Sequence, residues 1–256
     1  MNRSAVFCRM ALCAFLISSM SSRSGGAAPR NPDVLDRSLC DVCGLCTKEC
    51  YSGALELVGR DVTVEEVMDE VLRDKPFYNT SGGGLTLSGG EPLMQIDFSE
   101  KLLQSAKDEG LHCCVETCGF HDFSHFERVL PYVDLFLYDI KDIEDDCHRE
   151  YTGVSNIPIL ENIKQLHHCG AKIRIRLPII PGVNDREDHF QGLALLARSL
   201  PNLCGVEVIA YHRLGTSKAD RLGLSAEHFE QIEASDREMI SHWIATLKKL
   251  GVNVLQ

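Results

Sequence analysis

Four cysteines near the start of the chain have a spacing that suits iron–sulfur chemistry. They follow the pattern C-x2-C-x2-C-x3-C and are Cys40, Cys43, Cys46 and Cys50. The two-residue gaps let successive thiolates turn toward one [4Fe–4S] cluster, and Gly44 permits the tight backbone around it. A zinc site is the alternative, although zinc ligands usually form two C-x2-C pairs separated by a longer loop. The role of Cys50 stays open, because Tyr51 stands where a proline normally follows the fourth cysteine.

The rest of the chain alternates between short apolar segments and segments of helical periodicity. Strands are predicted at residues 85–87, 112–116, 134–140, 172–180, 205–210 and 252–255. Helices are predicted at residues 62–73, 97–108, 123–129, 157–168, 187–199 and 225–250. The first helix has Thr63 as its expected N-cap, with Glu66 three residues later. Repeated strand–helix units predict an α/β fold with a parallel sheet, which right-handed crossovers curl into a full or partial barrel.

Polar residues follow or close most of the predicted strands. In parallel α/β barrels the working residues lie at the carboxyl ends of the strands. The residues at such positions are Glu91, Glu116, Asp139, Lys141, Arg176 and His212. Each one alone is equally well explained as surface charge, but the whole set in register predicts a single site.

Composition excludes some classes of function. With 44% hydrophobic and 25% charged residues, the 256-residue chain can bury a substantial core. Of its 12 cysteines, those outside the first motif show no disulfide-framework spacing, which favours a reducing compartment. The net charge is −11, and no acidic residue precedes Asp33, so residues 33–256 carry 22 basic and 37 acidic side chains. Such an acidic body argues against a nucleic-acid-binding surface.

Residues 1–30 differ from the rest in composition. They contain arginines, serines and no acidic residue, with an apolar run at residues 11–17 that is too short to span a bilayer. This composition is compatible with an organelle transit peptide, with a secretory signal, or with a divergent segment that has no targeting role. An oxidising destination would endanger an iron–sulfur cluster, so the cytoplasm or the mitochondrial matrix is the expected location.

Six segments carry a resemblance to a known family. They are TLSGGEPLMQ (86–95), VETCGF (115–120), DLFLYDIK (134–141), REYTGV (149–154), RLPIIPGVND (176–185) and YHRLGTSK (211–218). The chain resembles the glycyl-radical-enzyme activating enzymes, pyruvate formate-lyase activase-like members of the radical S-adenosylmethionine (radical SAM) superfamily. The resemblance implies a partial (β/α)6 radical-SAM-type barrel lacking its first strand, at residues 61–256. A ferredoxin-type 4Fe–4S segment at residues 31–60 would correspond to half of an insert that many of these enzymes carry.

The resemblance also implies a site for S-adenosylmethionine. Gly89 and Gly90 let a ligand approach their backbone, and by resemblance this loop holds the methionyl amino group. Glu91 is expected to shape the turn and to attract the same ammonium group, with Glu116 also facing the amino acid end. Lys141 would pair with the methionyl carboxylate.

Three further residues receive roles by the same resemblance. Asp139 is expected to help hold a monovalent cation or the partner peptide. Arg176 would contact the methionyl carboxylate or the nucleoside, and His212 would hydrogen-bond the ribose or adenine side.

The family's chemistry requires a cysteine pattern that this sequence lacks. In the family, a C-x3-C-x2-C motif binds the cluster that cleaves S-adenosylmethionine reductively, and the resulting radical abstracts hydrogen from a glycine of the partner enzyme. No C-x3-C-x2-C occurs here, because Cys8 and Cys13 are the only earlier cysteines. No catalytic residue is therefore assigned, and the sequence suggests a truncated chain.

Three hypotheses follow from these observations. The first is an activating oxidoreductase that acts on a glycyl radical enzyme and receives electrons from flavodoxin or a ferredoxin-like donor. The second is a catalytically inactive, truncated 4Fe–4S binding protein. The third is a degraded structural fragment without a cofactor.

Overall fold

The structure, a computed structural model, describes residues 4–6, 41, 43–52, 55, 59–212 and 232–255. At its centre is a six-stranded parallel sheet whose strands lie in chain order. They are β3 (Gly84–Leu87), β4 (His112–Thr117), β5 (Leu135–Asp139), β6 (Ile173–Ile179), β7 (Gly205–Ala210) and β8 (Val254–Leu255).

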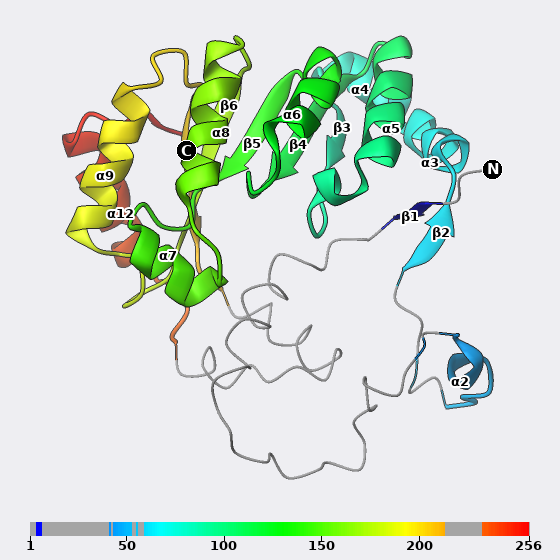
Figure 1. Cartoon of the computed structure of the whole chain (residues 1–256), viewed down its shortest axis with the longest axis horizontal. Helices are drawn as coiled ribbons and strands as arrows, with labels where there is room; N and C mark the ends of the chain where they lie inside the picture. The colour runs from blue at the N-terminus through cyan, green and yellow to red at the C-terminus, as the bar shows by residue number, and fades with distance from the viewer. Residues whose placement is uncertain are drawn as a thin grey trace.

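Helices cover one face of this sheet (Figure 1). They are α5 (Ile96–Asp108), α6 (Phe123–Val129), α8 (Ile157–His168), α9 (Glu187–Arg198) and α12 (Arg237–Lys249). The apolar side chains of β6 at Ile173, Ile175, Leu177 and Ile179 are buried on this face, whereas Arg174 and Arg176 point to the opposite, half-exposed face. We call that opposite side the inner face. Strand–helix units wound in one direction confirm the predicted α/β, barrel-type fold.

Most of the predicted elements are confirmed. The helices α6 and α8 and the strand β7 begin and end at the predicted residues. Among the described residues, the helices α2 (Leu45–Lys48), α4 (Lys75–Ser81) and α7 (Asp145–Thr152) and the short strands β1 (Ser4–Val6) and β2 (Arg60–Val62) have no counterpart in the prediction.

The helix predicted at residues 225–250 is wrong in its first part. Residues 232–236 are not helical, and α12 begins at Arg237. The Asp236 side chain accepts a hydrogen bond from the Met239 N–H at 2.8 Å, so it caps the helix and fixes its start there. Residues 225–231 lie outside the described residues.

A capping box begins α3 (Val64–Val71), as the sequence predicts. The Thr63 hydroxyl accepts a hydrogen bond from the Glu66 N–H at 3.2 Å, and the Glu66 carboxylate accepts one from the Thr63 N–H at 2.7 Å. Two N–H groups that would otherwise lack an intrahelical partner are thereby satisfied.

Thr63→Ala is expected to lower the free energy of unfolding by about 1 kcal/mol, the usual cost of losing a side-chain N-cap. Urea denaturation followed by circular dichroism measures this change. Thr80→Ala is the matched control, because the exposed Thr80 hydroxyl only donates back to the Pro76 carbonyl within α4. Equal midpoints for the two variants would show that the capping box contributes nothing to stability.

Short elements lie outside the sheet. β1 (Ser4–Val6) pairs antiparallel with β2 (Arg60–Val62), and α2 (Leu45–Lys48) falls inside the cysteine segment. Cys40 and most of residues 1–40 lie outside the described residues, so the boundaries at residues 30 and 60 and the missing first strand stay predictions. No described helix is both long and apolar enough to cross a bilayer.

Candidate functional site

Three charged side chains on neighbouring strands share the inner face. Asp139 on β5 lies opposite Arg176 on β6, and Glu116 on β4 lies opposite Leu137, two residues before Asp139. Side chains two residues apart on a strand point to the same face. The parallel register therefore brings Glu116, Asp139 and Arg176 together near the carboxyl ends of their strands.

Glu116, on β4, contacts a side chain from β6 and one from the loop after β3, and these two strands are not neighbours in the sheet. Its Oε1 forms an ion pair with Arg176 Nη1, and its Oε2 accepts a hydrogen bond from Ser88 Oγ at 2.9 Å. Both charged side chains are 22% exposed, so the pair is partly accessible to a ligand. Ser88 has no role in the sequence-based prediction, although it directly follows a strand, much as the candidate site residues follow or close theirs.

Asp139 and Lys141 form a second pair of opposite charge. Lys141 Nζ lies 3.7 Å from Asp139 Oδ2, which is longer than a hydrogen bond. Burial raises the pKa of the Asp139 carboxyl, and the positive charges of Lys141 and Arg176 oppose that increase. Among the described residues, Asp139 is the only ionic partner of Lys141, so the ammonium group retains hydrogen-bond donors for a ligand.

Glu91 is bound by protein donors from its own loop and from the end of β4. Its carboxylate accepts hydrogen bonds from the Cys118 N–H at 2.8 Å, the Thr117 hydroxyl at 3.0 Å and the Leu93 N–H at 3.3 Å. The side chain is 11% exposed. Glu91 thus shapes its own turn, as expected, and also joins the loop after β3 to the end of β4, a link that the sequence did not reveal.

The loop before Glu91 depends on glycine. Gly89 has φ of 139°, a backbone conformation that other residues rarely adopt, and Gly90 is buried. Gly119, which follows β4, has φ of 77°, and a Cβ there would overlap the Tyr138 hydroxyl. Both loops at this end of the sheet therefore have conformations that their glycines make possible.

His212 lies at the rim of this end of the sheet. It is exposed and follows Tyr211, whose N–H donates to the Ile179 carbonyl at 3.1 Å and so extends the pairing beyond β6 and β7. Residues 213–218, the rest of the motif that contains His212, lie outside the described residues.

The described cysteines of the first motif surround a short turn. Gly44 has φ of 73° and precedes α2, and Cys43 and Cys46 are exposed. The Leu55 N–H donates to Cys50 Sγ at 3.4 Å, a kind of contact that also surrounds iron–sulfur thiolates. Among described residues, no three His, Cys, Asp or Glu side chains are grouped to hold a metal, and Cys40 lies outside them.

The inner-face cluster suits binding of a ligand that carries both charges. Two carboxylates and two cations alternate there, and no thiolate nucleophile accompanies them. Burial raises the pKa of the Cys118 thiol to about 12 and also raises the pKa of the Cys114 thiol, which lies on the inner face two residues before Glu116, so both stay protonated at neutral pH.

Comparisons with known proteins show which family the chain resembles. The model of the Radical SAM superfamily matches residues 43–193. The isethionate sulfite-lyase activating enzyme of Nitratidesulfovibrio vulgaris is 40% identical over 226 residues, covering 82% of this chain and 73% of that protein. The pyruvate formate-lyase-activating enzyme of Staphylococcus aureus is 39% identical over 187 residues, covering 71% of this chain and 74% of that protein.

A solved structure shows the same fold. A domain of the pyruvate-formate lyase-activating enzyme from Bacteroides vulgatus superposes with a TM-score of 0.57 at 25% identity, covering 68% of this chain and 98% of that chain. A radical SAM methyltransferase from Sphaerobacter thermophilus, 18% identical, also has a TM-score of 0.57, covering 80% of this chain and 60% of that one.

The chain spans less than two thirds of several relatives. It covers 60% of the isethionate sulfite-lyase activating enzyme of Oleidesulfovibrio alaskensis, to which it is 43% identical over 187 residues, or 72% of this chain. The family is nevertheless shown by the matched model and by the relatives that are covered more fully. This chain belongs to the radical SAM superfamily and, within it, to the activating enzymes of glycyl radical enzymes.

Proposed function

We propose that this chain binds S-adenosylmethionine on the inner face of its sheet and serves to generate a glycyl radical on a partner enzyme. The observation that carries this proposal is the cluster of opposite charges at the carboxyl ends of β4, β5 and β6, in a chain of this family. Members of the superfamily use S-adenosylmethionine with a [4Fe–4S] cluster, which together supply reductive sulfonium cleavage and hydrogen abstraction.

The residues of the inner face fit the amino acid end of S-adenosylmethionine. A methionyl group carries a carboxylate and an ammonium, which require a cation and an anion close to each other. Lys141 supplies donors for the carboxylate, and Glu116 supplies an acceptor for the ammonium when Arg176 turns toward the ligand. Gly89 has no side chain and is partly exposed, so a ligand can approach its backbone closely, whereas Gly90 beside it is buried. His212 remains our candidate for the nucleoside side.

The cysteine segment supplies suitable donors for an iron–sulfur cluster. Cys40, Cys43, Cys46 and Cys50 would hold it through their thiolates. Exposed thiols on a short turn beside Gly44 can rearrange around a cluster, and the Leu55 N–H would stabilise the Cys50 thiolate. The spacing favours one [4Fe–4S] cluster that relays electrons.

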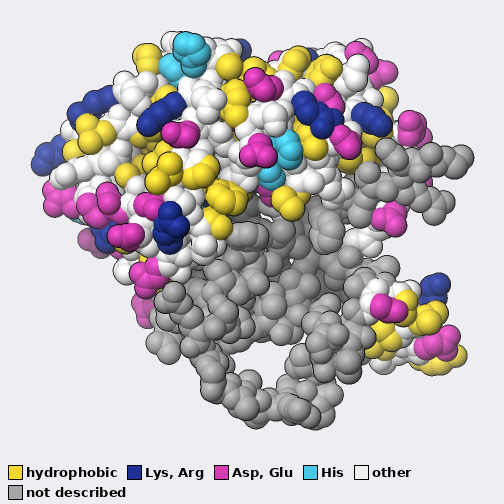
Figure 2. Space-filling model, viewed as in Figure 1, with side chains coloured by type: hydrophobic (Ala, Val, Ile, Leu, Met, Phe, Trp, Pro, Cys, Tyr) yellow, Lys and Arg dark blue, Asp and Glu magenta, His cyan; other side chains and the backbone are white. Residues whose placement is uncertain are grey.

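The partners follow from the reaction class. We infer that the protein substrate is a glycyl radical enzyme and that a flavodoxin or ferredoxin-like protein donates electrons. The relatives act with different partner enzymes by name, so only the class is inferred. Lys and Arg side chains are interspersed with Asp and Glu on the face in Figure 2, which gives nucleic acid no basic stripe to bind. A reducing compartment would preserve the cluster.

Anaerobic reconstitution with iron and sulfide tests the proposal. About four irons per chain, lost in Cys43→Ala, together with binding of S-adenosylmethionine would support an iron–sulfur protein with an intact binding face. Reductive cleavage of S-adenosylmethionine and a glycyl radical signal on a partner would establish the activity. Cluster binding without S-adenosylmethionine binding would instead support the 4Fe–4S binding protein considered from the sequence.

Lys141→Met is expected to weaken binding of S-adenosylmethionine about tenfold, because it removes one charge-assisted contact to the methionyl carboxylate. Isothermal titration calorimetry gives the dissociation constants. Lys164→Met is the matched control, since Lys164 is exposed on α8, on the opposite side of the sheet from the inner face. Equal loss of affinity in both variants would rule out a specific role for Lys141.

A further inference from the structure

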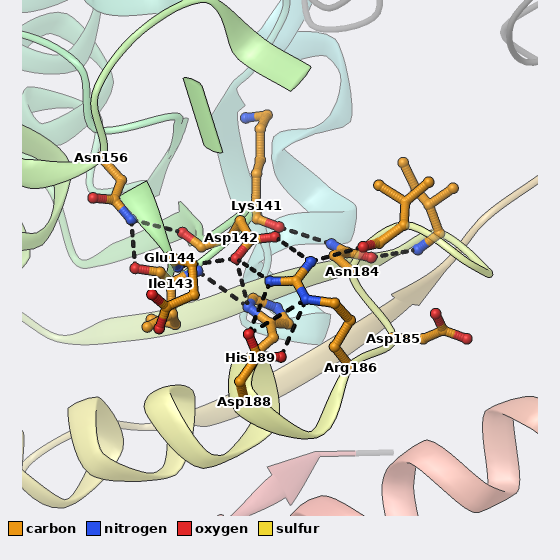
Figure 3. A network of polar contacts seen from close by, with 12 residues as sticks. Lys141, Asp142, Ile143, Glu144, Asn156, Asn184, Asp185, Arg186, Asp188 and His189 are labelled. Carbon is orange, nitrogen blue, oxygen red and sulfur yellow. Dashed lines mark hydrogen bonds and ion pairs between the residues drawn. The ribbon is translucent and has the colours of Figure 1, made fainter. Parts of the chain in front are cut away.

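The segment that carries Lys141 is held by side chains from two other parts of the chain. β5 ends at Asp139, and the Ile140 N–H makes a last bond to the Arg176 carbonyl at 2.9 Å. Residues 141–143 belong to no strand or helix, so their backbone groups form no hydrogen bonds of regular secondary structure. Figure 3 shows the polar contacts that replace such bonds.

Asn184 holds the backbone at Lys141 itself. Its Nδ2 donates to the Lys141 carbonyl at 2.7 Å and to the Pro178 carbonyl at 2.8 Å, and its Oδ1 accepts from the Ile180 N–H at 2.7 Å. The residue is only 4% exposed. One buried carboxamide therefore ties the backbone after β5 to the backbone at the end of β6.

Two more side chains hold the next residues. Asn156 Nδ2 donates to the Asp142 carbonyl at 3.1 Å and to the Ile143 carbonyl at 2.7 Å. The Ile143 N–H donates to Nδ1 of the fully buried His189 at 3.1 Å. The carbonyls of three successive residues and one N–H are thus bound by side chains rather than by secondary structure.

An ion pair between Arg186 and Asp142 also belongs to this network. The Arg186 guanidinium donates to both carboxylate oxygens of Asp142, at 3.0 Å and 3.1 Å, and to the Val183 carbonyl at 2.7 Å. In Figure 3 the Lys141 side chain extends away from this network, while its carbonyl points into it. The network therefore fixes the Lys141 backbone without contacting its ammonium group.

We propose that Asn184 is a positioning residue for Lys141, acting by holding the Lys141 carbonyl so that the ammonium group lies beside Asp139 at the ligand site. The inference rests on the proposed binding of S-adenosylmethionine. A flexible four-carbon side chain delivers its charge to one place only when its Cα is fixed, so loss of Asn184 costs affinity through Lys141.

A double-mutant cycle tests this coupling. The dissociation constant of S-adenosylmethionine is measured by equilibrium dialysis for the full chain and for Asn184→Ala, Lys141→Met and the double variant. Asn184→Ala is expected to weaken binding about fivefold in the original chain and less than about twofold once Lys141 is methionine. If Asn184→Ala weakens binding by the same factor with and without Lys141→Met, the two residues act independently and the proposal is overturned.

Asn162→Ala is the matched control. Asn162 is equally buried at 4% exposure, and its Nδ2 donates to the Gly119 and His121 carbonyls at 2.9 Å and 2.7 Å, away from the Lys141 segment. Asn162→Ala should change the dissociation constant by the same factor whether or not Lys141→Met is also present. If Asn184→Ala does not fold, Asn184→Asp replaces it, because aspartate retains the acceptor for Ile180 and loses both donors.

Hydrogen exchange separates this inference from the proposed function. Asn184→Ala should accelerate amide exchange in residues 141–144, and Asn162→Ala should not. If the original chain binds no S-adenosylmethionine, the proposed function fails, while faster exchange in these residues would still support the role of Asn184. Unchanged exchange would overturn that role whatever the affinity.

Discussion

Glu91→Ala should lower the free energy of unfolding by about 3 kcal/mol, because it leaves several backbone and hydroxyl donors without an acceptor. The Cys118 N–H, the Thr117 hydroxyl and the Leu93 N–H all donate to the Glu91 carboxylate, which is largely shielded from water. Hydrogen bonds to a charged acceptor are stronger than those between neutral groups. Urea denaturation of the unliganded chain measures the loss.

Two further variants sharpen this prediction. Glu161→Ala removes an exposed glutamate on α8 and should change stability by less than about 0.5 kcal/mol. Glu91→Gln keeps an acceptor oxygen and should recover part of the loss. If Glu91→Ala unfolded at the same urea concentration as Glu161→Ala, the carboxylate would not join the two loops, and a ligand-binding role alone would remain for it.

The sheet was predictable because its strands are short, apolar and bounded by polar loops. In β6 the alternation of isoleucine and arginine marks both the strand and its two faces, and the structure buries one set and leaves the other half-exposed. α6 and α8 carry regular apolar spacing, so their bounds were predicted well. In these segments the apolar positions in the local sequence are the ones that the fold buries, so the local pattern was sufficient.

Of the missed helices, α4 and α7 are stabilised by contacts that apolar periodicity does not reveal. α7 is strongly polar, and it is held by the buried His148, whose Nδ1 lies 2.8 Å from the Val154 carbonyl, and by Asp145, which accepts from Ser155 Oγ at 2.6 Å. α4 contains Asn, Thr and Ser in its last turn, residues of low helix propensity. Tertiary contacts stabilise α4, since Lys75 pairs with Glu109 at 2.7 Å and Tyr78 packs against the core, whereas α7 is held by the turn that follows it.

The site was predictable only in outline. Strand ends indicated that Glu116, Asp139 and Arg176 would gather, and the register brings them together. The sequence could not show that the carboxylate of Glu91 is occupied by protein donors, because two of its three donors, Thr117 and Cys118, lie at the end of a different strand. It also gave no sign that Asn184 binds the Lys141 carbonyl, since the two residues are distant in sequence.

Arg186→Met should lower the free energy of unfolding by about 2–3 kcal/mol at pH 7, because it leaves the buried Asp142 carboxylate without its bidentate partner. Arg186 is 29% exposed, so water offsets part of the full cost of an unpaired charge. Arg149→Met is the matched control. Arg149 pairs with Asp145 within α7 while 53% exposed, and its loss should cost less than about 0.5 kcal/mol.

The pH dependence of the stability lost in Arg186→Met shows whether the Asp142 carboxylate causes that loss. Burial raises the pKa of the Asp142 carboxyl, but the hydrogen bonds that it accepts from Arg186 and from the Glu144 N–H outweigh burial and lower the pKa to about 2. A carboxyl whose pKa is lower in the folded state stabilises the fold above its unfolded pKa, about 4, and this contribution disappears as the pH falls toward 2. The difference in unfolding free energy between the original chain and Arg186→Met should therefore shrink as urea denaturation is repeated from pH 5 down to pH 2.5. A difference that stayed constant over this range would assign the effect to lost packing of the arginine side chain, and Asp142 would then have no part in holding the segment that carries Lys141.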